Sequence, residues 1–251
     1  MFHSPVDDPG VHQRLSTPHR STISGWALAR RDGSRPGGAK TDASAAIPEP
    51  QRWNHNIHYF NALLDEVPAG AISGLDIGCG DGMLARRLRE RVERVVGIDL
   101  DRDQILLARS TAASERARRV DYVHGDVMTY RFDERFDVVV SVATLHHLDT
   151  EPALRRMADL VAPGGVLAIE GLARSTRPSD IYHDAVGTVL TQVLKRTGGR
   201  SYYTHSAPIV WPPKDSFADV RTIATAVLPG VRYTRHHLWR YTLVWHKRAA
   251  T

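Results

Sequence analysis

The sequence has one cysteine, Cys79, in 251 residues, so no disulfide can form within the chain. No apolar run approaches the roughly 18–20 residues that a membrane-spanning helix needs. The start of the chain also lacks the apolar core of a secretory signal. These absences exclude a disulfide-built secreted domain and disfavour a membrane partner, so we expect a cytoplasmic protein. Its oligomeric state is not encoded in any recognisable pattern.

The charge balance is basic, with a formal net charge of +5 and a pI near 9.5. Such a balance raises the hypothesis of a nucleic-acid partner. The arginines alternate with carboxylates, however, as in the stretch 86–94. Interleaved charges are typical of a solvated surface, which weakens the case for nucleic acid.

Proline, glycine, serine and threonine dominate residues 1–48, and no apolar period persists there. We expect a disordered N-terminal tail. Residues 49–251 form one predicted domain. It begins with a helix over 52–67, whose apolar residues recur at helical spacing and which we expect to act as a lid.

Apolar runs alternate with helical patterns across 72–172. Strands are predicted at 72–77, 94–99, 120–124, 136–142 and 166–170, and each of the first four leads into a helical or turn pattern. Residues 173–211 depart from this alternation and read as an insertion that covers the substrate. A helix and two closely spaced strands follow within 215–247, and the short connection predicts an antiparallel pair.

The fold class is therefore predicted as α/β, a doubly wound, seven-stranded, mostly parallel sheet with a C-terminal antiparallel hairpin and helices on both faces. In such sheets ligands bind at the carboxyl ends of the strands.

A glycine-rich turn follows the first core strand. The glycines are Gly78, Gly80 and Gly82, and Met83 stands where a dinucleotide fingerprint would have its third glycine. Asp76 precedes the turn. A carboxylate there does not suit an anionic ligand, whereas a cationic or zwitterionic ligand suits it well. A nicotinamide-type loop remains the competing interpretation.

The acidic-x-G-x-G-x-G turn resembles motif I of the class I S-adenosylmethionine-dependent methyltransferases. Asp99, at the end of the second strand, is similar to the family's ribose-binding acid, and Gly125-Asp126-Val127 is similar to its adenine-binding turn. The Leu145-His146-His147-Leu148 element and the Ala162-Pro163-Gly164-Gly165 turn are also common in small-molecule members. The terminal hairpin is another feature of the family, and it disfavours a nicotinamide-binding fold.

The resemblance implies S-adenosyl-L-methionine as cofactor. It implies that the cofactor is contacted by the motif I turn, by the ends of the second and third strands and by the residues at the end of the fourth strand. The cofactor residues expected on this basis are Asp76, Gly78, Cys79, Gly80, Gly82, Asp99, Leu100, Gln104, Gly125, Asp126, Val127, Val142 and His147.

The methyl group of such a cofactor is already activated, so much of the enzyme's work is alignment of the reactants. His146 is the candidate general base and Tyr59 a weaker alternative. Trp53, His58, Tyr182 and Asp184 are the candidate substrate-binding residues. No metal site is expected.

The acceptor class follows partly by exclusion. Cytosine C5 methylation needs a cysteine after the fourth strand, and amine methylation on nucleic acids normally uses a Pro-Pro-aromatic motif there; both are missing from Ser141-Val142-Ala143-Thr144. We therefore expect a small-molecule acceptor with an O, N or C nucleophile, as in natural-product metabolism. Methylation of RNA or another macromolecule, and non-enzymatic nucleic-acid binding, remain the alternatives.

Overall fold

A computed structural model describes residues 47–114, 120–197, 201–203 and 211–249. The tail predicted for residues 1–48 lies almost entirely outside the described residues, as does part of the predicted insertion. No helix among the described residues is long and apolar enough to cross a membrane.

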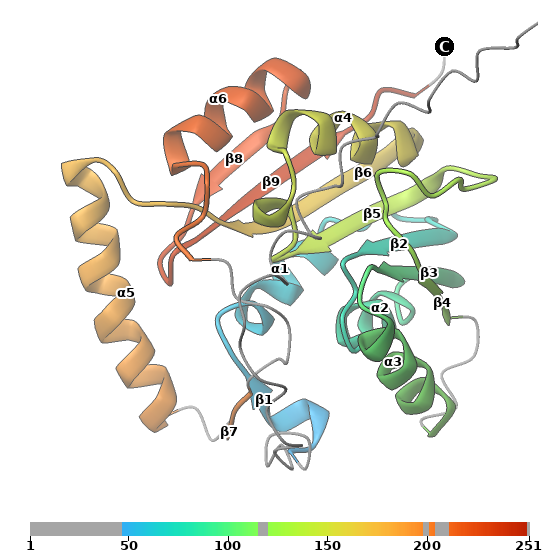
Figure 1. Ribbon diagram of the computed structural model, residues 1–251, viewed down its shortest axis with the longest axis horizontal. Coiled ribbons are helices and arrows are strands. Elements are labelled where there is room, and N and C mark those ends of the chain that lie inside the picture. Colours follow the sequence, from blue (N-terminus) through green and yellow to red (C-terminus); the bar gives the residue numbers. More distant parts are fainter. Residues whose placement is uncertain (1–46, 115–119, 198–200, 204–210, 250–251) are drawn as a thin grey trace, which may run out of the picture. The chain divides into compact units, whose positions relative to one another are not determined.

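A seven-stranded sheet organises the domain (Figure 1). In spatial order its strands are β4 (Val120–His124), β3 (Arg94–Asp99), β2 (Ser73–Ile77), β5 (Phe136–Val142), β6 (Val161–Leu172), β9 (Arg240–His246) and β8 (Arg232–Arg235). Pairing is parallel from β4 to β6, and antiparallel from β6 to β9 and from β9 to β8. The predicted fold class is confirmed, including the last strand inserted beside the fifth parallel strand.

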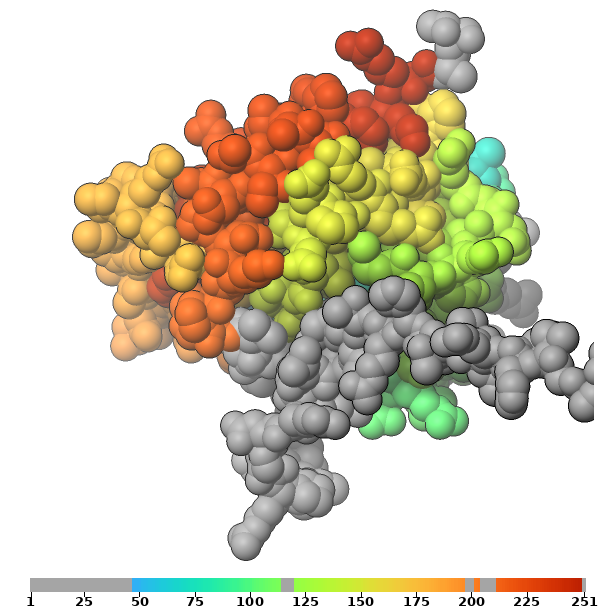
Figure 2. Space-filling view, turned by 45° about the horizontal axis from the view of Figure 1, so that its top comes forward, coloured from blue at the N-terminus to red at the C-terminus, as the bar shows by residue number. Residues whose placement is uncertain are grey.

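Helices cover both faces of the sheet. The helices α1 (Phe60–Leu64), α2 (Met83–Leu88) and α3 (Arg102–Ser114) pack on one face, where Val138, Val140 and Ala168 point. The helices α4 (Thr150–Leu160) and α6 (Phe217–Val227) pack on the other, and their surfaces adjoin in Figure 2. Both faces of the central strands are thus buried, as their continuous apolar runs predict.

The start of α6 follows local sequence rules. Ser216 accepts from the Asp219 amide, and the Asp219 carboxylate accepts from the Ser216 amide, which forms a reciprocal capping box. The 20-residue helix α5 (Pro178–Thr197) begins just after Arg177, where the Asp180 carboxylate accepts from two backbone amides. The helix α6 lies within the segment 215–247, where a helix and two strands were predicted.

The segment 52–67 differs from its prediction. It forms a two-residue strand β1 (Arg52–Trp53), a 3-10 turn at Ile57–Tyr59 and the short helix α1. The helix over 52–67 was wrong because Arg52 and Trp53 pair with β7 (Ser201–Tyr202), and Asn54 accepts from the amides of Asn56 and Ile57. Long-range pairing and an asparagine turn therefore override the helical spacing.

Candidate functional site

The glycine turn joins β2 to α2 at the carboxyl edge of the sheet. A side chain at Gly78, where φ is +72°, would place its Cβ 2.0 Å from Thr144 Oγ1. Among the described residues, a Cβ at Gly80, where φ is +53°, would meet only Gln104 Oε1 at 3.9 Å. Both positions favour glycine because φ is positive, but of the two only Gly80 leaves room, within the described part of the chain, for a ligand to approach its backbone.

Asp76 is the most unusual carboxylate at this edge. Its side chain is buried, and its Oδ2 has no hydrogen-bond partner among the described residues. Burial, together with the nearby charge of Asp99, raises the pKa of Asp76 to about 8, although the Ala85 amide donates to the carboxylate. A buried acceptor without a hydrogen-bond donor costs free energy. A cationic group of a ligand would pair with this oxygen and remove that cost.

Asp99 ends β3 and fixes the glycine turn. Its Oδ2 accepts from the Gly80 amide at 2.8 Å, and its Oδ1 accepts from the Asp101 amide at 2.8 Å. Burial raises the pKa of Asp99, while those backbone N–H donors act in the opposite direction. Each carboxylate oxygen has a further lone pair, so Asp99 can hold the turn and still accept from ligand hydroxyls.

Asp126 follows β4 and is half-buried. Its Oδ1 accepts from the Met128 amide at 2.9 Å and caps the turn that ends at Tyr130. Since β2, β3 and β4 are adjacent and parallel, the three acids predicted from the sequence lie at or near the carboxyl ends of neighbouring strands, at one edge of the sheet. That edge is where open α/β sheets bind nucleosides.

The other predicted cofactor residues lie on the same elements. Cys79 is buried, and burial raises the pKa of its thiol, so the group is neutral and acts in packing. Gln104 is buried on α3, and the Leu100 carbonyl lies 3.1 Å from His124 Nε2. Gly82 directly precedes α2, with φ +79°. The remaining members border the turns after β4 and β5, and they are Gly125, Val127, Val142 and His147.

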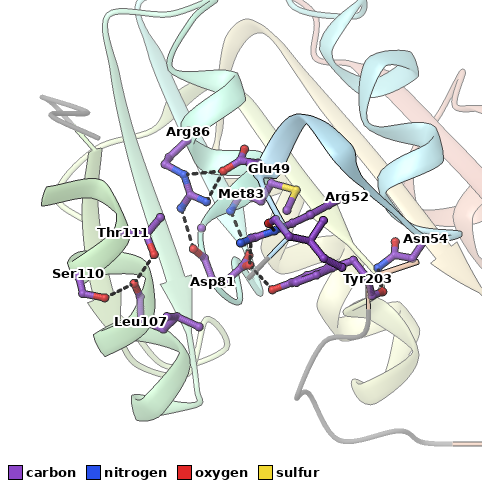
Figure 3. A network of polar contacts seen from close by, with 12 residues as sticks. Glu49, Arg52, Asn54, Asp81, Met83, Arg86, Leu107, Ser110, Thr111 and Tyr203 are labelled. Atoms are coloured by element: carbon purple, nitrogen blue, oxygen red, sulfur yellow. Dashed lines mark hydrogen bonds and ion pairs between the residues drawn. The ribbon is translucent and has the colours of Figure 1, made fainter. Parts of the chain in front are cut away.

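A polar network not anticipated from the sequence ties residues 49–54 to the glycine turn (Figure 3). Asp81 Oδ2 accepts from the Tyr203 hydroxyl at 2.8 Å and lies 3.5 Å from Arg52 Nη1. Arg86 donates to the Asp81 carbonyl and to Glu49 Oε2, each at 2.7 Å. These contacts place the segment before α1 against the turn, so its position and that of the turn are coupled.

Residues 52–54 contact Tyr203, in the later part of the predicted insertion. The Tyr203 amide donates to the Trp53 carbonyl, and Asn54 Nδ2 donates to the Tyr203 carbonyl. Trp53 itself is buried, with its Nε1 3.4 Å from His58 Nδ1, whereas His58 is exposed. Of these two predicted substrate residues, Trp53 packs within the domain and His58 lies at its surface.

The two predicted catalytic residues have contrasting surroundings. His146 is largely buried after β5, and its Nδ1 has no partner among the described residues. Burial, followed by the neighbouring His147 and Arg240, lowers the pKa of His146 to about 3. The Tyr59 hydroxyl donates to the His237 carbonyl at 2.8 Å, and burial raises its pKa to about 12. Both side chains are therefore neutral near pH 7.

A buried ion pair, also missed from the sequence, lies on the α1 side of the sheet. Arg240 Nε is 2.6 Å from Glu170 Oε1, and Glu170 is fully buried. Burial raises the pKa of Glu170 to about 7, against the lowering effect of Arg240. Arg240 also donates to Asn56 Oδ1 at 2.6 Å. The pair is a diagonal cross-strand contact between β6 and β9, so only the register of the hairpin creates it.

The two substrate candidates on α5 lie apart from the sheet edge. Tyr182 is 66% exposed and contacts the ring of His237. Asp184 accepts from Ser175 Oγ at 3.0 Å and lies 3.8 Å from Arg235 Nη2. Asp184 thus secures α5 to the hairpin, and its carboxylate is engaged within the protein. Among the described residues, no group of three or more metal-ligating side chains is placed to hold an ion.

Comparison with known proteins agrees with this geometry. Residues 75–165 match the family model described as a methyltransferase domain. An uncharacterised methyltransferase of Mycobacterium tuberculosis strain H37Rv is 39% identical over 198 residues, which are 78% of this chain and 97% of that protein. A ubiquinone biosynthesis O-methyltransferase of Azorhizobium caulinodans is 35% identical over 122 residues, 48% of each chain.

Solved structures show the same fold at low identity. An S-adenosylmethionine-dependent methyltransferase from Aquifex aeolicus superposes with a TM-score of 0.52 at 16% identity, covering 74% of this chain and 88% of that one. The [4+2]-cyclase SpnF superposes with a TM-score of 0.55 at 16% identity, covering 77% and 82%. Since one of these neighbours is titled a cyclase, the fold by itself does not fix the reaction.

Proposed function

The chain belongs to the class I S-adenosylmethionine-dependent methyltransferases, and on that premise we propose that it methylates a small-molecule acceptor at an O, N or C nucleophile. The observation that carries the proposal is the buried Asp76 carboxylate, whose Oδ2 has no partner among the described residues, near the Gly80 backbone. This pair suits a ligand with a cationic amine and close backbone contact.

S-adenosylmethionine supplies an activated methyl group when it is bound. In our proposal Asp76 binds the ammonium of its methionyl part, Asp99 accepts from the ribose hydroxyls, and Asp126 accepts from the adenine amine. The ordered turns around these acids hold the cofactor in one orientation. Fixed alignment of nucleophile and methyl carbon can lower the activation free energy by roughly 7–11 kcal/mol.

His146 and Tyr59 are proposed to act on the acceptor as neutral groups. With its pKa near 3, the His146 imidazole accepts a hydrogen bond from an acceptor O–H or N–H but removes a proton only weakly. With its pKa near 12, Tyr59 keeps its proton and positions the acceptor. The pKa values of both side chains therefore favour a reaction in which alignment of the reactants contributes more to the rate than proton removal does.

The small-molecule acceptor is supported by the relative named as a ubiquinone biosynthesis O-methyltransferase, which is 35% identical over about half of this chain. It is supported also by the basic side chains, many of which are paired. Arg86, Arg94 and Arg232, for example, form ion pairs with Glu49, Glu134 and Glu66. Paired charges are poor phosphate contacts, so an RNA acceptor is the weaker candidate.

Calorimetry with S-adenosylmethionine, S-adenosylhomocysteine and NAD tests the cofactor half of the proposal. We expect both sulfur compounds to bind and NAD not to bind. Binding of NAD alone would contradict it. The acceptor half is tested by incubating the protein and methyl-labelled S-adenosylmethionine with cellular RNA and, separately, with a protein-free metabolite extract. Label in the metabolite fraction is expected, and label confined to RNA would overturn the acceptor class.

The role of His146 is testable once an acceptor is identified. We expect His146→Asn to lower kcat while S-adenosylhomocysteine affinity is unchanged, because the side chain faces the acceptor in our proposal. His246→Asn is the matched control, since His246 is largely exposed at the end of β9. Equal kcat values for the two variants would remove His146 from the mechanism.

A further inference from the structure

The helix α5 has two unlike faces. Its inner face packs on the tip of the β8–β9 hairpin, where a Cβ at Gly187 would lie 3.0 Å from the Leu238 amide nitrogen, and Thr191 Oγ1 lies 3.2 Å from His55 Nε2. Its outer face is exposed and mostly apolar, with Gln192 as an exposed polar member. Exposed fractions are 69% for Ile181, 64% for Val189 and 47% for Val193.

The exposed residues form one stripe along the helix. At 100° per residue, Ile181, Ala185, Val189 and Val193 lie within about a third of the circumference, and Tyr182 lies within the same sector. The stripe runs along most of the helix. In Figures 1 and 2 the helix stands at the edge of the domain, beyond α6 and well apart from α4. Scattered exposed apolar residues are ordinary, but four that share one side of a helix indicate a binding surface.

The exposed charged side chains on α5 and just before it are basic, and the exposed Asp219 carboxylate of α6 lies near Arg174 and Arg177. The α5 carboxylates, Asp180 and Asp184, are turned inward and bound by backbone amides or by Ser175. The basic side chains stand at both ends of the helix. They are Arg174 and Arg177 before the helix and Lys195 and Arg196 in its last turn.

We propose that the outer face of α5 docks on the surface of an anionic membrane, with the apolar stripe at the headgroup boundary and the basic ends on lipid phosphates. An apolar stripe with basic side chains at both ends is the pattern of an interfacial helix, in which apolar burial and attraction to anionic lipids both favour binding. The same helix carries polar groups on its inner face, so it lies on the membrane rather than crossing it.

Self-pairing is the main competing use of such a face, and the charges disfavour it. An antiparallel pair of α5 helices would bring Arg174 and Arg177 of one copy to Lys195 and Arg196 of the other, and a parallel pair would bring like ends together. Either arrangement sets cations against cations. The N-terminal residues 1–46 contain more arginine and lysine than aspartate and glutamate, so they are not a complementary cover either.

Vesicle flotation tests the proposal with the full-length protein. We expect it to float with vesicles of equal parts phosphatidylcholine and phosphatidylglycerol, and not with pure phosphatidylcholine. Raising the salt concentration should weaken binding because the phosphate contacts are screened. Absence of binding to the anionic vesicles would overturn the proposal.

Val189→Asp places a carboxylate in the middle of the stripe. We expect roughly tenfold or greater loss of vesicle partitioning, because apolar contact is lost and a negative charge meets anionic lipid. Thr222→Asp is the control, since it makes a similar change at an exposed site on α6. Equal partitioning of the two variants would refute the assignment of this face.

Two further measurements separate the possible causes of failure. Affinity for S-adenosylhomocysteine should be the same in the wild type, Val189→Asp and Thr222→Asp, which shows that both variants are folded and keeps this test independent of the methyl-transfer proposal. Sedimentation should give a concentration-independent mass. A dimer that Val189→Asp abolishes would assign the face to self-association and overturn membrane docking.

Discussion

Replacement of Asp76 by asparagine is the most informative single change, because one group governs both stability and ligand binding. Asp76 is buried, and its pKa is raised from 3.8 to about 8. Folded Asp76 is mostly protonated at pH 7, about three units above its unfolded pKa, and each unit corresponds to about 1.4 kcal/mol, so taking up that proton costs the folded state roughly 4 kcal/mol. Asparagine keeps the shape and the acceptor for the Ala85 amide without that penalty.

The ligand-free protein should show this as a pH-dependent stability. Because the folded pKa is the higher one, the native state binds more protons than the unfolded state between about pH 4 and pH 8. The contribution of Asp76 to the free energy of unfolding is therefore largest at low pH, declines through that window and is constant above it. The free energies of unfolding of the wild type and Asp76→Asn, measured by urea denaturation, should differ by up to a few kcal/mol at neutral pH, with the variant more stable.

Ligand binding should show the opposite sign. A cationic amine favours the ionised carboxylate, so S-adenosylmethionine should release up to one proton per site below pH 8, and its affinity should rise about tenfold per pH unit until that point. Asp76→Asn should bind roughly ten- to hundredfold more weakly near pH 8, the usual effect of losing a charge-assisted hydrogen bond.

Calorimetry in buffers of different ionisation enthalpy measures the proton release directly. Asp121→Asn, an exposed carboxylate on β4, is the control for net charge. If the wild type releases no proton, or if Asp76→Asn binds S-adenosylmethionine as tightly as Asp121→Asn does, the assigned role of Asp76 is refuted.

Three other changes have defined outcomes. Asp99→Ala removes the acceptor for the Gly80 amide, so S-adenosylhomocysteine affinity should fall about a hundredfold by calorimetry; unchanged affinity in a folded variant excludes the ribose role. Arg240→Ala leaves Glu170 buried without its partner and should lower the free energy of unfolding by about 3–5 kcal/mol, a loss that Glu170→Gln in the same chain should partly reverse; equal loss in single and double variants would argue against the pair. Tyr203→Phe removes the hydroxyl bond to Asp81 and should lower unfolding free energy by about 1–2 kcal/mol in urea titrations, whereas no change would show that the contact contributes nothing.

The core of the fold was predictable because its signals are local. Strands β3, β4 and β5 were predicted at their observed boundaries, since their apolar runs are short, continuous and bounded by turn residues. The helix α5 and the capping box at Ser216 follow from neighbouring residues in the same way. The segment 52–67 was mispredicted because its partners, Tyr202 and Tyr203, lie some 150 residues away, where helical spacing carries no information.

The sequence by itself determined the order of the βα units, the glycine turn and the three acids near the ends of successive strands, because a parallel sheet brings such positions to one edge. Only the tertiary structure decided which of these groups is left unpaired. Whether Asp76 keeps a free oxygen, whether Glu170 meets Arg240, and whether the acids of α5 turn inward depend on register and packing between distant segments. Burial and pairing set the free energy of ionising a buried group, and neither can be deduced from the residue or from its neighbours along the chain.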